Sequence, residues 1–117
     1  MCGIAGWVGA NKKNKNLVEQ KTGIIGNIVD SQNHRGPDAR GVWSSDTNSV
    51  VLGHNRLSII ELSETGSQPM HSSDGRWVIT YNGELYNYKV LRKILEKKFG
   101  VVFRGNSDTE VFLYGFI

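Results

Sequence analysis

The chain of 117 residues has the length of one domain. Its hydrophobic fraction of 38% and charged fraction of 21% are typical of a globular protein rather than a disordered one. The single cysteine excludes an internal disulfide, and no segment resembles a signal peptide or a membrane span, so we expect a cytoplasmic protein without membrane contact. The formal net charge of +3 owes much to Lys12, Lys13 and Lys15 in an Asn-rich loop. A nucleic-acid surface needs a broader basic face, so we expect no nucleic-acid partner.

The segment 1–6 holds that cysteine at position 2. If Met1 is removed, Cys2 becomes the N-terminus and has a thiol nucleophile and a free α-amine on one residue. The unperturbed pKa of the amine is about 7.7–8.0 and that of the thiol is about 8.5. The amine can therefore accept the thiol proton near neutral pH without a histidine. The alternative is a buried, unreactive cysteine near the start of a strand, and Cys2 by itself does not separate the two.

The next segments contain a strand, a helix and a polar turn. We expect a strand over 3–8, a loop over 11–16, and a helix over 17–32. The apolar positions of the helix (17, 18, 24, 25, 28 and 29) have helical spacing and predict a core-facing stripe. The segment 33–38 contains a Gly-Pro turn with three ionisable side chains. It is either a polar surface turn or a loop that lines a site.

Two β-forming segments, 39–44 and 49–57, flank a turn at 45–48 and predict a hairpin. The second segment contains Arg56 between apolar residues. Such an arginine either extends to solvent or is held inside to bind a planar anion such as a carboxylate. The Ser-, Gly- and Thr-rich segment 61–74 is long enough to act as a lid.

A third type of candidate site follows the strand expected over 76–81, which ends in Asn82-Gly83-Glu84. Asn-Gly at the end of a strand is typical of a tight turn. The asparagine amide and the glycine N–H are also a good donor pair for an oxyanion.

The last third is expected to contain a helix over 88–99, a strand over 101–103 and a helix over 109–117. Asn87 is a candidate cap of the first helix, and Gly100 fits its end. Ser107 or Asp108 is a candidate cap of the second. The sequence has neither a Walker-type glycine loop nor paired Cys/His metal spacing, so we expect no metal.

Taken together and in order, the motifs resemble one family. Met-Cys-Gly-Ile-Ala-Gly at the start is similar to the class II glutamine amidotransferases, which use an N-terminal cysteine nucleophile. The motifs that resemble the asparagine synthetase branch are His34-Arg35-Gly36-Pro37-Asp38, Arg56-Leu57-Ser58-Ile59-Ile60, Gly66-Ser67-Gln68-Pro69-Met70, Tyr81-Asn82-Gly83-Glu84-Leu85-Tyr86-Asn87 and Ser107-Asp108-Thr109-Glu110. One motif would be weak evidence, but this many in the family order is specific. One departure is Glu61, which stands where the family usually has aspartate.

The resemblance implies the following roles. Cys2 attacks the side-chain amide of L-glutamine, and the Asn82 side chain and Gly83 N–H stabilise the oxyanion. Arg56 binds the α-carboxylate of glutamine, and Asp108 with Glu84 binds its α-ammonium group. The remaining substrate-binding residues are Leu57, Ser58, Ile59 and Ile60. The products are glutamate and ammonia.

The resemblance also implies a fold and partners. The fold is α+β, an N-terminal-nucleophile hydrolase sandwich (αββα) with two antiparallel sheets, which we expect to be incomplete in this chain. Residues 1–117 then form the N-terminal part of a glutaminase domain, and the synthetase domain is absent. That domain would bind ATP and Mg²⁺ and use the ammonia to amidate a carboxylate, most often aspartate to asparagine. No cofactor is implied for the present domain, and a homodimer is one assembly to test.

Two other hypotheses remain open. The first is that the chain is a non-catalytic glutamine-binding fragment or remnant. The second is that it is another N-terminal-nucleophile amidase that acts on a different amide. Arg56 and Asp108 argue against the last, because they suit the two charged ends of a free amino acid.

Overall fold

The computed structural model describes residues 1–9, 15–47, 49–59 and 61–117, and it describes the helix at 15–18 without its side chains. Most of the loop expected over 11–16 therefore lies outside the described residues. The same is true of Lys12 and Lys13 in the basic cluster and of Ile60 in the predicted substrate-binding segment.

The first half of the chain forms a three-stranded antiparallel sheet. Its strands are β1 (Gly3–Val8), β2 (Ala39–Ser44) and β3 (Val50–Arg56), in the order β1-β3-β2. The predicted hairpin is thus confirmed as β2 and β3. In the register, Gly3 pairs with Asn55, and Ala39 pairs with Arg56. Cys2, immediately before β1, therefore lies at the end of the sheet where Arg56 ends β3.

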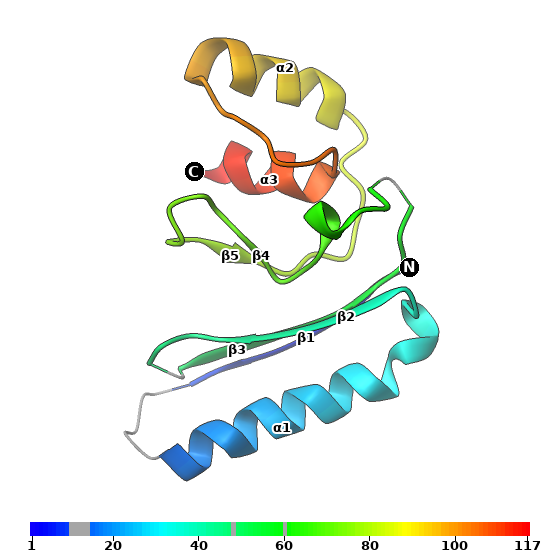
Figure 1. The fold of residues 1–117 in the computed structure, drawn as a ribbon, viewed down its shortest axis with the longest axis vertical. Helices are drawn as coiled ribbons and strands as arrows, with labels where there is room; N and C mark the ends of the chain where they lie inside the picture. The colour runs from blue at the N-terminus through cyan, green and yellow to red at the C-terminus, as the bar shows by residue number, and fades with distance from the viewer. Residues whose placement is uncertain (10–14, 48, 60) are drawn as a thin grey trace.

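Helix α1 (Lys15–Ser31) covers one face of this sheet (Figure 1). Ile25 and Val29 are fully buried against Val51. A Cβ at Gly53 would overlap a methyl group of Val29, so this glycine lets the helix approach the strand closely. The predicted helix is confirmed, but only part of its apolar stripe is buried. Ile24 and Ile28 are 46% and 39% exposed because they lie about 100° around the helix from Ile25 and Val29.

The second half of the chain starts with shorter elements. A 3₁₀ turn, η1 (Asn33–Arg35), follows α1, and a second one, η2 (Glu64–Gly66), precedes a two-stranded sheet of β4 (Met70–His71) and β5 (Val78–Ile79). The strand expected over 76–81 is therefore mostly wrong, and only its centre is β. Strand length is limited here because β5 pairs only with the two residues of β4.

Helices α2 (Tyr88–Phe99) and α3 (Asp108–Phe116) complete the described chain. Gly100 ends α2 with a left-handed φ of 65°, as predicted. Asn87 is at the N-cap position of α2 but makes no side-chain cap bond, whereas the Ser107 hydroxyl caps α3 by accepting from the Glu110 N–H. The strand expected over 101–103 is wrong. Phe103 packs against aromatic and guanidinium groups instead of pairing with a strand in the described part of the chain.

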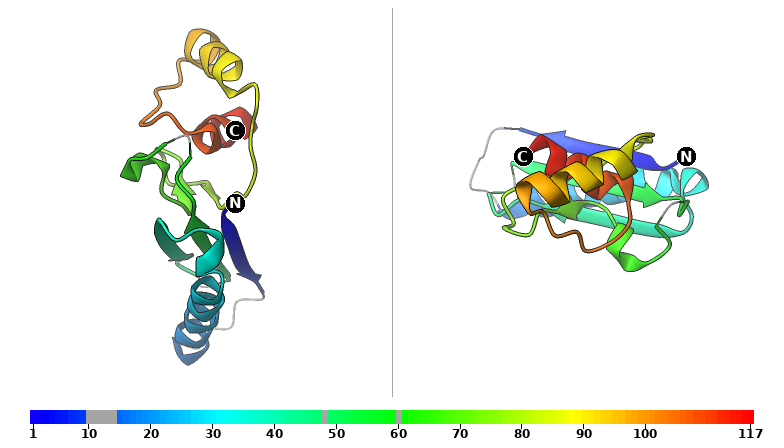
Figure 2. Two further views of the ribbon diagram at one scale, coloured as in Figure 1. Left: turned by 90° about the vertical axis from the view of Figure 1, so that its right-hand side faces the viewer. Right: turned by 90° about the horizontal axis from the view of Figure 1, so that it is seen from above.

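The described molecule is α+β with antiparallel sheets, as expected. We call α1 with β1–β3 the sheet lobe, and residues 61–117 the helical lobe. Figure 1 shows the order α1, three-stranded sheet, two-stranded sheet, then α3 and α2, and Figure 2 shows these layers from two further sides. The radius of gyration is 15.1 Å, against about 13 Å for a compact domain of about 100 residues, so the two lobes form an elongated body.

Candidate active site

Cys2 lies where the two lobes meet. Its Sγ accepts a hydrogen bond from the Leu57 N–H at 3.3 Å, just beyond the end of β3. Its carbonyl accepts from Arg35 Nε at 3.2 Å. The first contact holds Cys2 against the segment that follows β3, and the second holds it against the turn η1. While Met1 is attached, the nitrogen of Cys2 is an amide and cannot act as a base. Met1 is 76% exposed and lines the same cavity as Cys2, so it is accessible for removal.

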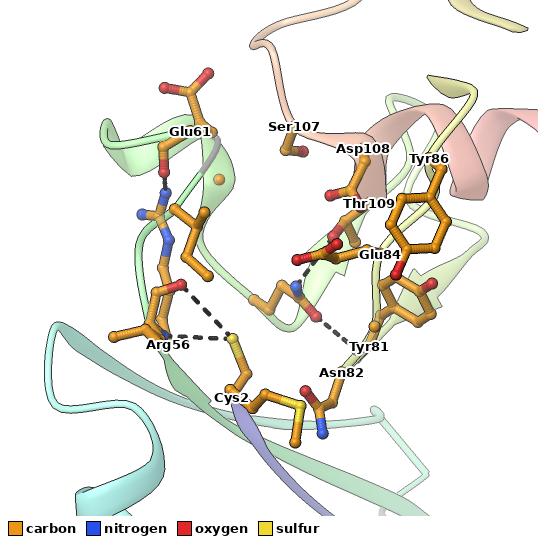
Figure 3. Close-up of a pocket in the computed structure, with 16 residues that line it drawn as sticks. Cys2, Arg56, Glu61, Tyr81, Asn82, Glu84, Tyr86, Ser107, Asp108 and Thr109 are labelled. Carbon is orange, nitrogen blue, oxygen red and sulfur yellow. Dashed lines mark hydrogen bonds between the residues drawn. The ribbon is translucent and has the colours of Figure 1, made fainter. Parts of the chain in front are cut away.

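A cavity of about 360 Å³ opens above Cys2, within the range of small-molecule sites. Both lobes contribute to its lining, which contains Met1, Cys2, Arg56, Leu57, Ile59, Glu61, Gly66, Gln68, Tyr81, Asn82, Gly83, Glu84, Tyr86, Ser107, Asp108 and Thr109. Figure 3 shows Cys2 on the floor, Arg56 on one side, and Glu84 and Asp108 on the opposite side. The cavity therefore places a thiol between a cationic wall and an anionic wall.

The cationic wall is Arg56, which is buried with 7% exposure. Its Nη1 donates to the Ser63 carbonyl at 2.7 Å, and its Nη2 donates to the Glu61 carbonyl. Neither partner is charged, so the guanidinium keeps its positive charge available to a ligand. Arginine suits this role because its planar fork matches a carboxylate.

The anionic wall is formed by Asp108 at the start of α3 and by Glu84. Asp108 is 7% exposed, and its Oδ2 accepts from the Leu85 N–H at 2.9 Å. The charge of this wall acts on the neighbouring Tyr81 hydroxyl. Burial first, and then the Asp108 and Glu84 carboxylates, raise the pKa of Tyr81 above its ordinary value. A cationic group of a ligand would be stabilised in the same field.

The proposed oxyanion donors, Asn82 and Gly83, follow Tyr81 and also line the cavity. Both are exposed, and no hydrogen bond joins the Asn82 amide or the Gly83 N–H to another described residue. A Cβ at Gly83 would lie 2.6 Å from the Tyr81 hydroxyl oxygen, so a larger residue here would require the Tyr81 ring to shift. The two donors are thus free to bind a ligand oxygen.

The structure brings most of the predicted site residues together. Cys2, Arg56, Leu57, Ile59, Asn82, Gly83, Glu84 and Asp108 all line the cavity, whereas Ser58 does not. The Ser58 N–H instead donates to Asp38 Oδ2 at 2.7 Å. The predicted turn at 33–38 therefore supports the site through Arg35 and Asp38, which hold the segments of Cys2 and Ser58, while His34 is exposed.

Sequence reasoning missed two supporting residues. The Tyr81 N–H donates to Gln68 Oε1 at 2.6 Å, and the Tyr81 carbonyl accepts from His54 Nε2 at 3.2 Å. Gln68 Nε2 also donates to the Thr109 hydroxyl at 3.2 Å. Both backbone groups of the residue before Asn82 are therefore held by side chains. Gln68 was visible only as part of a loop motif, and no sequence signal for His54 was recognised.

The described residues contain no cluster of three or more His, Cys, Asp or Glu side chains that could hold a metal ion. No helix in the described ranges is long and apolar enough to cross a membrane.

Comparison with known proteins agrees with this geometry. The sequence model of the family described as "Glutamine amidotransferase domain" matches residues 1–117. "Asparagine synthetase [glutamine-hydrolyzing] 3" of Bacillus subtilis is 41% identical over 119 residues, which cover 100% of this chain and 18% of that protein. "Amidase chry2" of Gibberella zeae is 42% identical over 95% of the chain and 17% of its own length. "Asparagine synthetase [glutamine-hydrolyzing] 1" of Bacillus subtilis is 48% identical over 68% of the chain and 12% of its own length.

The chain belongs to the family of glutamine amidotransferase domains. It spans less than one fifth of the length of these relatives. Two of them are named as glutamine-hydrolysing asparagine synthetases.

Proposed function

We propose that this chain carries the glutaminase site of an asparagine-synthetase-type amidotransferase. The observation that carries the proposal is the cavity in which Cys2 lies between Arg56 on one wall and Asp108 with Glu84 on the other. L-Glutamine has a carboxylate and an ammonium group at one end and an amide at the other. The two walls match the charged end, and the thiol faces the space where the amide would lie.

The reaction follows from these positions. After removal of Met1, the α-amine of Cys2 takes the thiol proton, and Sγ forms a bond to the amide carbon of glutamine. The carbon–nitrogen bond then breaks, the amine returns the proton to the leaving nitrogen, and ammonia departs. Water attacks the remaining thioester and releases glutamate and the free thiol.

Asn82 and Gly83 would stabilise the negative oxygen of each tetrahedral intermediate. Their donors have no partner among the described residues, so they can turn to the ligand without breaking an existing bond. Loss of one such donor typically raises the barrier by about 3–4 kcal/mol. Leu57 and Ile59 would contact the glutamine side chain, and Ser58 would hold their segment through its bond to Asp38. Ile60 belongs to the same proposed substrate-binding segment.

The wider context is also a proposal. We assign the chain to the N-terminal part of an N-terminal-nucleophile hydrolase sandwich, supported by the helix–sheet–sheet–helix order of its layers. The names and lengths of the relatives support a separate synthetase domain, which would receive the ammonia and amidate a carboxylate, most often aspartate. We propose that this domain depends on ATP and Mg²⁺. The glutaminase domain itself needs no cofactor for the steps above. A cytoplasmic location and a homodimer complete the proposal.

The experiment is intact-mass analysis of the protein as its gene encodes it, with and without 6-diazo-5-oxo-L-norleucine, an electrophilic glutamine analogue. We expect loss of one methionine and one stoichiometric adduct that disappears in Cys2→Ala. Retention of Met1, or a processed Cys2 that stays unlabelled, would contradict the proposal. Calorimetric binding of L-glutamine without release of glutamate would favour the non-catalytic binding alternative instead.

A panel of amides tests the amidase alternative. We expect hydrolysis of L-glutamine but little of 4-aminobutanamide, which lacks the carboxylate, or of glutaramic acid, which lacks the ammonium group. Each missing charge should cost about 10- to 100-fold in kcat/KM, because a hydrogen bond to a charged group contributes about 1.5–3 kcal/mol. Equal rates on all three amides would point to a different amidase.

A further inference from the structure

The two charged walls of the cavity come from different lobes, so their spacing depends on what joins them. Arg56 ends β3 of the sheet lobe, and Asp108 starts α3 of the helical lobe. Recognition of an amino acid by both its α-carboxylate and its α-ammonium group requires that Arg56 and Asp108 keep one separation. The segment 61–63 lies between them and contacts both sides.

On the Arg56 side, the contacts are made by the main chain of this segment. The guanidinium donates to the carbonyls of Glu61 and Ser63. A Cβ at Gly66 would lie 2.8 Å from Glu61 Cγ and 3.0 Å from Arg56 Cζ, so the segment closes tightly over the guanidinium. The position of the Arg56 guanidinium therefore depends on the conformation of the segment 61–63.

That conformation is maintained by the Glu61 carboxylate. Its Oε1 accepts from the Ser63 N–H at 3.0 Å and from the Ser63 hydroxyl at 2.7 Å. The same hydroxyl accepts from the Thr65 N–H at 3.3 Å and caps η2. The bonds from Ser63 to the Glu61 carboxylate thus hold the segment 61–63 in the conformation in which the carbonyls of Glu61 and Ser63 accept from Arg56.

On the Asp108 side, the contact is made by the other carboxylate oxygen. Glu61 Oε2 accepts from the Asn106 N–H at 2.6 Å, two residues before Asp108. The adjacent N–H groups of Arg104 and Gly105 donate to the fully buried Glu110 carboxylate of α3 at 2.8 and 3.0 Å. A Cβ at Gly105 would overlap the Thr65 hydroxyl oxygen, so the two loops are in direct contact. Three successive N–H groups before α3 are therefore held by two carboxylates.

We propose that Glu61 is a positioning residue that sets the separation between Arg56 and Asp108 and so tunes affinity for a free α-amino acid. This inference rests on the function proposed above. The hydrogen bonds from Ser63 and Asn106 hold the pKa of Glu61 at about 2, so the carboxylate is ionised at any working pH. Its role is in substrate affinity, because it touches neither Cys2 nor the oxyanion donors through a hydrogen bond in the described structure.

The test is steady-state glutaminase kinetics of Glu61→Gln in the intact protein. Glutamine has one acceptor oxygen and an NH₂ group, so it cannot accept from both Ser63 and Asn106. We expect KM for L-glutamine to rise about tenfold, the effect of losing one hydrogen bond to a charged group, while kcat changes little. The rate at which iodoacetamide alkylates Cys2 should stay the same, because that reagent uses neither wall.

The matched control is Glu64→Gln in the same loop, whose carboxylate has no hydrogen bond to the described part of the chain. It should leave KM unchanged. Ser63→Ala removes one of the three bonds and should raise KM less, which keeps the test available if Glu61→Gln does not fold. In the Asp108→Asn background, Glu61→Gln should raise KM little further, because the carboxylate whose distance from Arg56 it sets is already absent.

The outcomes separate the two proposals. An active wild-type protein in which Glu61→Gln and Ser63→Ala both keep the wild-type KM would overturn the role of Glu61 alone. A fall in kcat and in alkylation rate with unchanged KM would also overturn it, since Glu61 would then act on the nucleophile. A wild-type protein that neither hydrolyses nor binds L-glutamine would overturn the proposed function together with this inference.

Discussion

His54 lies two residues before Arg56 on β3 and is 1% exposed. Its Nε2 must carry the proton, because its partner, the Tyr81 carbonyl, can only accept. Burial lowers the pKa of His54, the hydrogen bond to Tyr81 opposes this, and the charge of Arg56 lowers the pKa further. The neutral imidazole thus supports the residue that precedes the oxyanion donors.

This burial predicts an acid sensitivity of the fold. Below pH 6.5 the unfolded chain binds a proton at His54 that the folded chain does not, so the free energy of unfolding falls as the pH is lowered towards the folded pKa. The slope from this one group is at most about 1.4 kcal/mol per pH unit. Urea unfolding at pH 7.5 and 5.5 should show a smaller fall in His54→Gln than in the wild type. The exposed His34→Gln is the control, and an equal fall in all three proteins would contradict the prediction.

At the scale of single elements, two glycines associated with helices differ in whether their position requires glycine. Gly100 ends α2 in the left-handed region with φ of 65°, where a side chain is strained. Gly23 lies within α1, and a Cβ there would meet no atom within 4 Å. The first position requires glycine, and the second does not.

Alanine substitutions should therefore change stability in opposite directions. Gly100→Ala should lower the free energy of unfolding by about 1 kcal/mol, because alanine must adopt a left-handed conformation. Gly23→Ala should raise it by about 0.8–1 kcal/mol through helix propensity. Chemical denaturation of both variants beside the wild type measures these changes. Destabilisation by Gly23→Ala would show that the interior of α1 tolerates no side chain at this position.

At the scale of the whole molecule, the sheet lobe and helix α2 differ in how many side chains they bury. The sheet lobe has a core in which Ile25, Val29 and Val51 are at most 1% exposed. Helix α2 has no buried residue, and Val90 and Phe99 on it are 61% and 71% exposed. Burial of apolar surface is the main source of stability, so α2 should open without unfolding of the sheet lobe.

Hydrogen exchange measured by mass spectrometry on the 117-residue chain tests this difference. Amides of β3 and the second half of α1 should exchange slowly, at the rate of global unfolding. Amides of α2 should exchange much faster, through local opening that leaves the sheet lobe intact. Equal protection of α1 and α2 would show that α2 unfolds together with the sheet lobe.

Periodicity and local signals predicted much of the secondary structure. The helix over 88–99 and its end at Gly100 agree with α2, because apolar spacing and a glycine stop act within one helix. The strands over 76–81 and 101–103 failed in whole or in part, because a strand needs a partner elsewhere in the chain. Phe103 has β-propensity, but its neighbours are Arg92 and Tyr114 rather than a strand.

The order of short motifs by itself determined the family and identified Cys2, Arg56, Asn82 and Asp108 as candidate site residues. This was possible because the chemistry depends on the type of each residue, which the sequence motifs contain directly. Only the tertiary structure decided which side chains support them. Glu61 joins Asn106 across 45 positions, and His54 holds Tyr81 across 27. Such contacts depend on how the lobes pack, and no local pattern of residues encodes a hydrogen bond between segments so far apart in the chain.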